Sequence, residues 1–418
     1  MRRALPVTLP LASLAVVAIL YLLVGRNREV PEQWFKGNTH THSLWSDGND
    51  FPEMIARFYR ENGYHFLVLT DHNVLSRGEK WMSVKEVEKR RRIPTHSTLE
   101  KYVTSFGQEW VELRGKDDQQ EVRLKTLEEI RPKFEQPGGF LFIEGEEISA
   151  SFNSKHIHIN ALNLDEVIEP KEGDSVRETM RNNLIAVKEQ AERLQRPILA
   201  HVNHPNFHWS VTAEDIAHVL EEDFFEVYNG HPVINHLGDA DRPGDQQIWD
   251  IANTIRLSEL GARPLFGVAT DDSHTYHGGD VMPGRGWIMV NAESLGAEVL
   301  LEAMRAGDFY ASTGVTLRQV IRDQKKGELR FEIVPDEGVR YTTQIIGTRR
   351  GAEHDPSKIG EVLATFEGHS IRYQLSDEHW YIRATVNSDR PHPKASYKDQ
   401  LEQAWVQPIW NPATTSKP

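Results

Sequence analysis

The stretch GNTHTHSLWSDGNDF, residues 37–51, places two histidines one residue apart and an aspartate five positions after the second. In a β-strand, alternate side chains point to the same face of the sheet. The side chains of His40 and His42 can therefore reach one shared ligand, while Thr41 points away. Asp47 lies in the turn-forming sequence SDG, which can return its carboxylate to the same pocket. The stretch predicts a site where imidazole and carboxylate groups act together.

The segments around this stretch alternate between strand and helix patterns. A strand-like start at 34–42 leads to a helix over 51–64, where the apolar residues fall near one face, and then to an apolar strand over 65–73. Strand, helix and strand in this order favour a parallel α/β sheet. After a charged segment of about 76–136, which we interpret as an insertion of exposed helices and a hairpin, the alternation resumes. Further strands are expected over 139–149, 155–164, 196–206, 224–230 and 263–276, and helices over 175–195, 212–222 and 245–261.

Polar side chains cluster after each apolar strand. In a parallel barrel these positions meet at the carboxyl edge, where active sites are built. The clustered residues are His40, His42, Asp47, Asp71, His72, Glu144, Glu146, Glu147, His156, His158, His201, His204, Glu226, Asp271, Asp272 and His274.

A single histidine after a strand is most often a hydrogen-bonded residue near the surface. Six successive strand ends that each offer imidazole or carboxylate weaken this interpretation. The chain has 19 histidines and no cysteine, so thiolate nucleophiles and cysteine zinc sites are excluded. Imidazole with carboxylate suits Zn, Mn or Fe, and carboxylates can bridge two such ions. The pattern predicts a multinuclear hydrolytic metal site.

Composition describes a soluble globular body. Of the 418 residues, 39% are apolar and 26% are charged. The net charge of −14 argues against a general nucleic-acid surface, so no nucleic acid is expected beyond a possible nucleotide substrate. The length suits a large catalytic domain and a smaller module. The oligomeric state is left open.

Residues 4–25 carry no charge and follow Arg2 and Arg3. The run is just long enough to span a bilayer, and no small-x-small cleavage site follows it. We therefore predict a signal anchor over 1–25 and a linker over 26–36. The catalytic body is expected on the extracytoplasmic side of the membrane, periplasmic or extracellular. A cleaved signal and a secreted protein form the alternative.

The pattern of polar and apolar residues changes after the sequence GDFYASTG. From 316 to 418 the chain alternates polar and apolar residues with turn signals between the runs. This is typical of antiparallel strands, and it predicts a small C-terminal antiparallel β domain.

The motifs HTHSLWSDG, LTDHN, GEEIS, HIN, NHPN, FEVYN and TDDSHTY occur together in this order. As an ordered set they resemble the PHP (polymerase and histidinol phosphatase) superfamily, and most of all its stand-alone phosphoesterases. The resemblance spans the predicted domain of 37–315. It implies a distorted seven-stranded (β/α)7 TIM-like barrel with a two- or three-metal site.

The resemblance also implies a ligand set, motif by motif. The implied ligands are His40, His42, Asp47, His72, Glu147, His158, His204, Asp272 and His274. Four of these assignments have an alternative residue. These are Glu144 or Glu146 instead of Glu147, His156 instead of His158, His201 instead of His204, and Asp271 instead of Asp272. Asp71 is expected to support the ligands, and Glu226 either to support them or to face the substrate; neither is expected to bind metal.

The predicted function is a metal-dependent phosphoesterase that acts on a small phosphorylated substrate. Two or three divalent ions of Zn, Mn or Fe would activate water as the nucleophile, and Asp47 and Asp272 would orient it. Arg285, in PGRGW, is the candidate substrate-binding cation. One alternative is hydrolysis of amide or lactone bonds, which the absence of a cationic clamp would favour. Another is a cell-surface binding module without catalysis.

Overall fold

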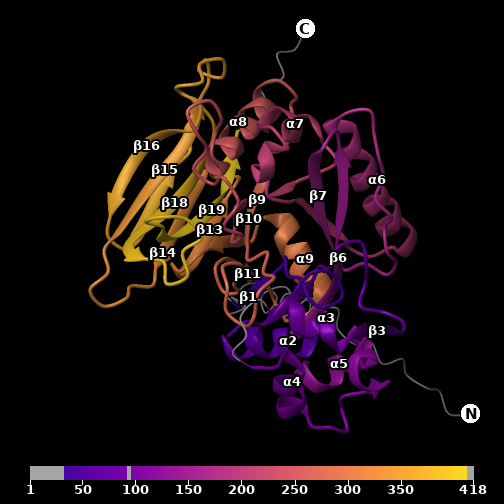
Figure 1. Cartoon of the computed structure of the whole chain (residues 1–418). Helices are drawn as coiled ribbons and strands as arrows, with labels where there is room; N and C mark the ends of the chain where they lie inside the picture. The colour runs from indigo at the N-terminus through magenta and orange to yellow at the C-terminus, as the bar shows by residue number, and fades with distance from the viewer. Residues whose placement is uncertain (1–32, 92–95, 412–418) are drawn as a thin grey trace, which may run out of the picture.

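The computed structural model describes residues 33–91 and 96–411 (Figure 1). The predicted anchor over 1–25 and most of the predicted linker over 26–36 lie outside these ranges. The first strand begins at Trp34, before the predicted end of the linker. In the described ranges, no helix has both the length and the apolar character needed to cross a membrane.

The motif-bearing region alternates strands and helices, as the sequence predicts. Local signals set several boundaries: Pro52 opens the first helix, and the Ser175 hydroxyl accepts the Glu178 N–H at the start of the longest one. The elements in chain order are β1 (Trp34–Asn38), α2 (Pro52–Glu61), β2 (Phe66–Leu69), β6 (Leu141–Phe152), β7 (Lys155–Leu162), α6 (Val176–Leu194), β8 (Leu199–Val202), α7 (Ala213–His218), β9 (Phe224–Asn229), α8 (Asp245–Ser258) and β10 (Phe266–Thr270).

Thirteen strands form one mixed sheet, in the order β10-β9-β8-β7-β6-β2-β1-β11-β12-β19-β18-β15-β16. The pairs β1–β2, β2–β6, β8–β9 and β9–β10 are parallel, whereas β7 runs antiparallel to both β6 and β8. The expectation of an all-parallel strand set is therefore wrong at β7. The reason is the two-residue turn after β6. Asn153 (φ 47°) and Ser154 (φ 64°) both adopt the left-handed conformation of a tight hairpin turn, and a parallel connection needs a dozen or more residues.

The seven strands of the motif region share one core. A single hydrophobic cluster takes side chains from β1, β2, β6, β7, β8, β9 and β10 and from α9 (Ala297–Ala306), among them Phe35, Phe66, Ile143, Leu162, Leu199, Phe224 and Phe266. In the described residues, however, no ladder joins β1 to β10. One isolated parallel bridge, Thr41 to Ser273, links the segments just beyond their carboxyl ends. The sheet is curled around a core, but strand pairing does not close it into the predicted barrel.

The charged insertion forms a small unit at the lower end of the molecule in Figure 1. Its three-stranded sheet and short helices are β3 (Lys80–Ser83), α3 (Val84–Arg90), α4 (Thr98–Phe106), β4 (Leu113–Arg114), β5 (Glu121–Leu124) and α5 (Leu127–Phe134). Tyr102 and Val122 of the insertion pack with Leu44 and Trp45 of the opening motif. The Trp45 indole also donates to the Lys125 carbonyl at 3.1 Å. The insertion thus supports the segment that follows β1.

Most of the C-terminal strands extend the same sheet on the side opposite α6 (Figure 1), whereas β13, β14 and β17 form a separate three-stranded sheet. Every strand pair within this region is antiparallel. Its strands are β11 (Trp287–Asn291), β12 (Phe309–Ser312), β13 (Leu317–Asp323), β14 (Glu328–Ile333), β15 (Tyr341–Arg349), β16 (Glu361–Glu367), β17 (Ser370–Gln374), β18 (His379–Pro391) and β19 (Leu401–Trp410). Because β1 pairs with β11 and β12 pairs with β19, strand pairing is continuous from the motif region into this region.

Gln407 of β19 is buried against β10. Its side-chain oxygen accepts the Gly267 N–H and its amide donates to the Gly267 carbonyl, both at 2.8 Å. We expect Gln407→Leu to lower the free energy of unfolding by roughly 2–4 kcal/mol, because two buried backbone groups lose their partner. Urea titration would measure the loss. Gln403→Leu on the same strand removes a half-buried side chain bonded to Asn387 and is expected to cost only about 1 kcal/mol. Equal costs for the two variants would contradict the role of Gln407.

Candidate metal centre

Glu147 stands at the centre of a group of buried histidines. It lies on β6 and is 1% exposed. Five imidazoles lie within 3.5 Å of its carboxylate: His72 at 2.9 Å, His158 at 3.0 Å, His204 at 3.3 Å, and His40 and His42 each at 3.4 Å. The strand carboxylate that the GEE motif predicts is therefore the point on which five imidazoles from four strand segments converge.

The two histidines of the opening motif face each other. Their Nε2 atoms are 3.1 Å apart, while the Thr41 hydroxyl turns the other way, toward Tyr59. Both histidines lie just past β1, in an extended segment whose backbone pairs with 272–273 through two hydrogen bonds. The predicted alternation therefore holds beyond the end of the strand.

Two aspartates complete the cluster from opposite loops. An Asp272 oxygen lies 3.2 Å from Nε2 of both His40 and His42. Asp47 lies 3.4 Å from His274, 3.6 Å from His42 and 3.7 Å from His72, and its side chain is 55% exposed. Asp272 thus lies at the buried end of the cluster, and Asp47 lies at its solvent-exposed end.

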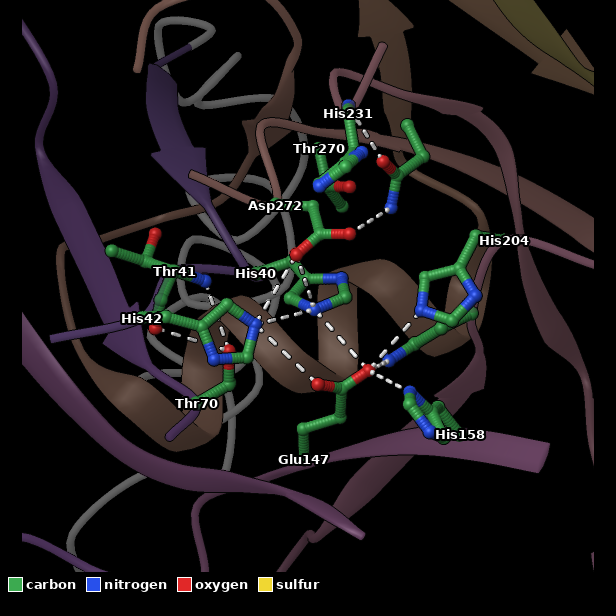
Figure 2. A network of polar contacts seen from close by, with 12 residues as sticks. His40, Thr41, His42, Thr70, Glu147, His158, His204, His231, Thr270 and Asp272 are labelled. Carbon is green, nitrogen blue, oxygen red and sulfur yellow. Dashed lines mark hydrogen bonds and ion pairs between the residues drawn. The ribbon is translucent and has the colours of Figure 1, made fainter. Parts of the chain in front are cut away.

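Figure 2 shows His42, His40, His158 and His204 arranged around Glu147, with Asp272 on the far side of His40. Four adjoining groups in the described residues have ligand atoms within 4.8 Å of one another: His42 with Asp47, His72 and His274; His40 with His204 and Asp272; His40 with His42 and Glu147; and His72 with Glu147 and His158. All nine predicted ligands fall in these groups. Imidazole nitrogens mixed with carboxylates suit divalent transition metals. The donor set therefore fits the metals that the sequence predicts, while their number and identity stay predictions.

The rival residues lie outside these groups and have other partners. Asp271 accepts the Gly284, Arg285 and Gly286 N–H groups, so it anchors the loop after β10. Asp272 follows it in the left-handed backbone conformation (φ 47°), and its carboxylate lies 3.2 Å from Nε2 of both His40 and His42 instead. His201 bonds to the Thr39 hydroxyl, and His156 packs its ring on Phe207.

The two rival glutamates of β6 also point elsewhere. Glu144 makes a two-pronged ion pair with Arg77, with both distances 2.7 Å. Glu146 is buried on the other face of the strand and accepts the Ile168 N–H. Burial raises the pKa of Glu146 to about 8. Because side chains alternate along β6, Glu147 points into the histidine group, whereas Glu144 and Glu146 do not.

A ring of supporting groups holds the cluster in place. Glu226 accepts from His40 Nδ1 at 2.7 Å, which leaves His40 Nε2 facing the centre. Asn229 donates to Glu226 at 2.7 Å and to Asp272 at 3.1 Å. Asp71 accepts the Ser43 N–H at 2.7 Å and so fixes the loop after β1. Asp71 and Glu226 therefore have the supporting positions expected from the sequence.

Burial and neighbouring charges set the protonation of the cluster. Burial, with the charges of His274 and His72, lowers the pKa of His42 to about 4. Burial opposes ionisation of Glu226, but the adjacent His40 outweighs it and lowers the pKa of Glu226 to about 2. Glu147 and Asp272 likewise have pKa values well below the ordinary range, against the effect of burial, because imidazoles surround them. Charged carboxylates and a neutral His42 are the donors that a metal requires.

A cavity of about 160 Å³ opens beside the cluster. It is lined by Asp47, His72, Glu147, His158, His204, Phe207, His231, Asp272 and His274. Sequence reasoning missed Phe207 and His231. His231 follows the strand that carries Glu226, in YNGHP, and its place directly after a strand was the available signal.

Arg285 does not line this cavity. It is 2% exposed, and its guanidinium donates to the carbonyls of Gly230, Asp280 and Ala395. These contacts tie the loop after β10 to neighbouring loops. A substrate-binding role for Arg285 stays a prediction that its contacts do not support.

Metal is expected to stabilise the protein, because buried carboxylates would gain a cationic partner. An ion at 100 times its Kd stabilises the folded state by about 2.7 kcal/mol. The melting temperature of chelator-treated protein should therefore rise when Zn²⁺ or Mn²⁺ is added. Mg²⁺, which prefers oxygen ligands, serves as the control and should shift it less. No shift with any transition metal would contradict the assignment.

No family model matches the sequence, and a search of curated proteins gives no match. Among solved structures, a two-domain protein of Bacteroides vulgatus that contains a predicted PHP-like metal-dependent phosphoesterase is 14% identical. The similarity covers 90% of this chain and 95% of that one, with a TM-score of 0.35.

Two further structures cover less of this chain. A candidate metal-dependent phosphoesterase of Bifidobacterium adolescentis is 12% identical, with 58% of this chain and 87% of that one covered and a TM-score of 0.28. An amidohydrolase of Chromobacterium violaceum is 14% identical, with 57% and 87% covered and a TM-score of 0.27. Since all three TM-scores are below 0.5, these similarities assign no activity to this chain.

Proposed function

We propose that this chain is a metal-dependent phosphoesterase of the PHP type. One observation carries the proposal: nine imidazole and carboxylate side chains, Glu147 among them, converge in four adjoining groups from six strand segments, at or beyond β1, β2, β6, β7, β8 and β10. These polar side chains come from positions between residue 40 and residue 274, and packing of an apolar core does not require them to lie together. The shared core of seven strands and the Thr41–Ser273 bridge support a distorted barrel as the frame.

Each part of the site has a task in such a hydrolase. Two or three divalent ions, when bound, would supply Lewis acidity, lower the pKa of a water molecule and offset phosphoryl charge. Asp47, exposed at the mouth, and Asp272, at the buried end, would accept hydrogen bonds that orient the attacking water. Glu226 and Asn229 keep His40 and Asp272 in position, so that the site is preorganised.

A second candidate is hydrolysis of an amide or lactone. It is favoured by one observation: among the described residues that line the cavity there is no lysine or arginine. A small phosphorylated substrate would thus depend on the metals to balance its charge, whereas a carbonyl substrate needs no cationic clamp. Both candidates use the same metals to polarise the reacting group.

A substrate panel separates the two candidates. Protein stripped with chelator would be reloaded with Zn, Mn or Fe and assayed on phosphate monoesters, phosphate diesters, amides and lactones. We expect metal-dependent release of alcohol from at least one phosphate ester class. Turnover of amides or lactones alone would support the second candidate. Absence of metal binding and of any turnover would reject both.

The cellular setting is a separate proposal that rests on the sequence of residues 1–25. We propose that this segment anchors the protein, with the catalytic body outside the cytoplasm. Fractionation should then place the full-length protein in the membrane pellet. A soluble protein whose mature N-terminus lies near residue 26 would instead indicate a cleaved signal.

A further inference from the structure

Two residues that line the cavity are not among the predicted ligands, namely Phe207 and His231. Phe207 offers only an apolar ring. Of the described residues that line the cavity, His231 is thus the only one outside the predicted ligand set whose side chain can donate a hydrogen bond.

Contacts within its own loop determine which nitrogen of His231 is available. Nδ1 accepts the Val233 N–H at 3.3 Å, so the neutral ring carries its proton on Nε2. In the described residues, no hydrogen-bond partner of Nε2 is found. The ring meets His274 edge to face, with 5.7 Å between centroids. The Nε2–H is therefore the free donor of a side chain that lines the cavity.

The backbone of His231 is linked to the ligand groups through the side chain of Asn229. Its N–H donates to Asn229 Oδ1 at 2.8 Å, and the Asn229 amide donates in turn to Asp272 and Glu226. Figure 2 shows His231 beside Thr270 and above Asp272, on the side of the network away from Glu147. The donor is thus held at a defined place relative to Asp272.

His231 is not placed as a ligand itself. Among the described residues, none of the four groups with converging ligand atoms includes it. A fixed neutral donor at the edge of a hydrolytic site can stabilise negative charge that develops on a reacting oxygen.

We propose that His231 is a catalytic residue that donates its Nε2–H hydrogen bond to the leaving oxygen of the substrate. This inference rests on the proposed phosphoesterase function. In the reaction, water forms a new P–O bond, and the bond from phosphorus to the leaving oxygen breaks with its electron pair on that oxygen. One proton of the water stays on the phosphate and the other reaches the leaving oxygen through solvent. His231 keeps its proton throughout and stabilises the charge on the leaving oxygen.

The test varies the leaving group and the side chain together. Full-length wild type, His231→Phe and His231→Gln would be loaded with the same metal and assayed on phenyl phosphate and 4-nitrophenyl phosphate. Phenolate is the poorer leaving group and needs more stabilisation. We expect His231→Phe to lose roughly 10²-fold in kcat/KM on phenyl phosphate, as loss of one preorganised donor does, and far less on 4-nitrophenyl phosphate. His231→Gln, which keeps an N–H donor, should recover part of the loss.

Metal content and folding provide readouts independent of rate. Elemental analysis and melting should show the wild-type metal content and a folded protein for both variants. His218→Phe on α7 is the matched control and should behave as wild type on both substrates. In the part of the chain that the structure describes, its imidazole bonds only to the Glu214 carbonyl of its own helix.

Each other outcome overturns the inference in a distinguishable way. Equal losses on the two substrates, or none, would show that His231 does not act on the leaving oxygen. A fall in metal content in both variants would show that it is a ligand. If the wild type binds metal but hydrolyses no phosphate ester, the proposed function itself fails and the inference falls with it.

Discussion

Glu147→Gln is expected to abolish metal-dependent hydrolysis while leaving the protein folded. The substitution keeps the shape of the side chain but removes the charge on which five imidazoles converge. A metal that supplies several kcal/mol of transition-state stabilisation would be lost or displaced, so the rate should fall by roughly 10³-fold or more. The measurements are kcat/KM on the best ester substrate and metal content per chain.

Glu144→Gln is the matched control on the same strand. Its carboxylate binds Arg77 and lies outside the histidine group, so activity and metal content should remain those of the wild type. A Glu147→Gln protein that retains its metals and most of its rate would refute the central place of this residue. Circular dichroism would separate loss of the site from loss of the fold.

Arg383→Met is expected to cause the largest loss of stability. Arg383 of β18 makes a two-pronged bond to Asp250 of α8, at 2.7 and 2.6 Å, and Tyr381 donates to the same carboxylate at 2.7 Å. Both partners are buried, with Arg383 1% and Asp250 3% exposed. Removing one partner leaves an uncompensated buried charge, which costs about 3–5 kcal/mol. Denaturant titration would measure the loss.

Arg349→Met provides the comparison in the neighbouring strand β15. Arg349 pairs with Glu361, but the side chains are 45% and 33% exposed, so the loss should stay below about 1 kcal/mol. Similar costs for the two variants would contradict the interpretation. Because Asp250 lies on α8 and Arg383 in the C-terminal sheet, a large cost at Arg383 would also show that the two regions depend on each other for stability.

Much of the strand and helix pattern could be predicted, because it depends on neighbouring residues. The helix over 51–64 and the strand over 65–73 correspond to α2 and β2, whose apolar spacing and terminal residues are local signals. The direction of β7 could not be read from apolar alternation, because alternation is the same in parallel and antiparallel strands. Asn153 and Ser154 were the only local indication of a hairpin, and they are weaker than Asn-Gly.

For the candidate site, the sequence by itself determined the kinds of donor and their positions after strands. It also determined that cysteine takes no part. It left His156 against His158 and Asp271 against Asp272 open, since candidates only one or two residues apart look alike in a linear pattern.

Only the tertiary structure decided which member of each pair faces the cluster, that Arg285 binds backbone carbonyls, and that His231 lines the cavity. The physical reason is the distance along the chain between the residues that interact. Periodicity and turn signals are encoded within a few consecutive residues, whereas the contacts of His40 with Glu147, Glu226 and Asp272 span from 107 to 232 positions along the chain. Such contacts exist only once the strands have paired and curled around their common core.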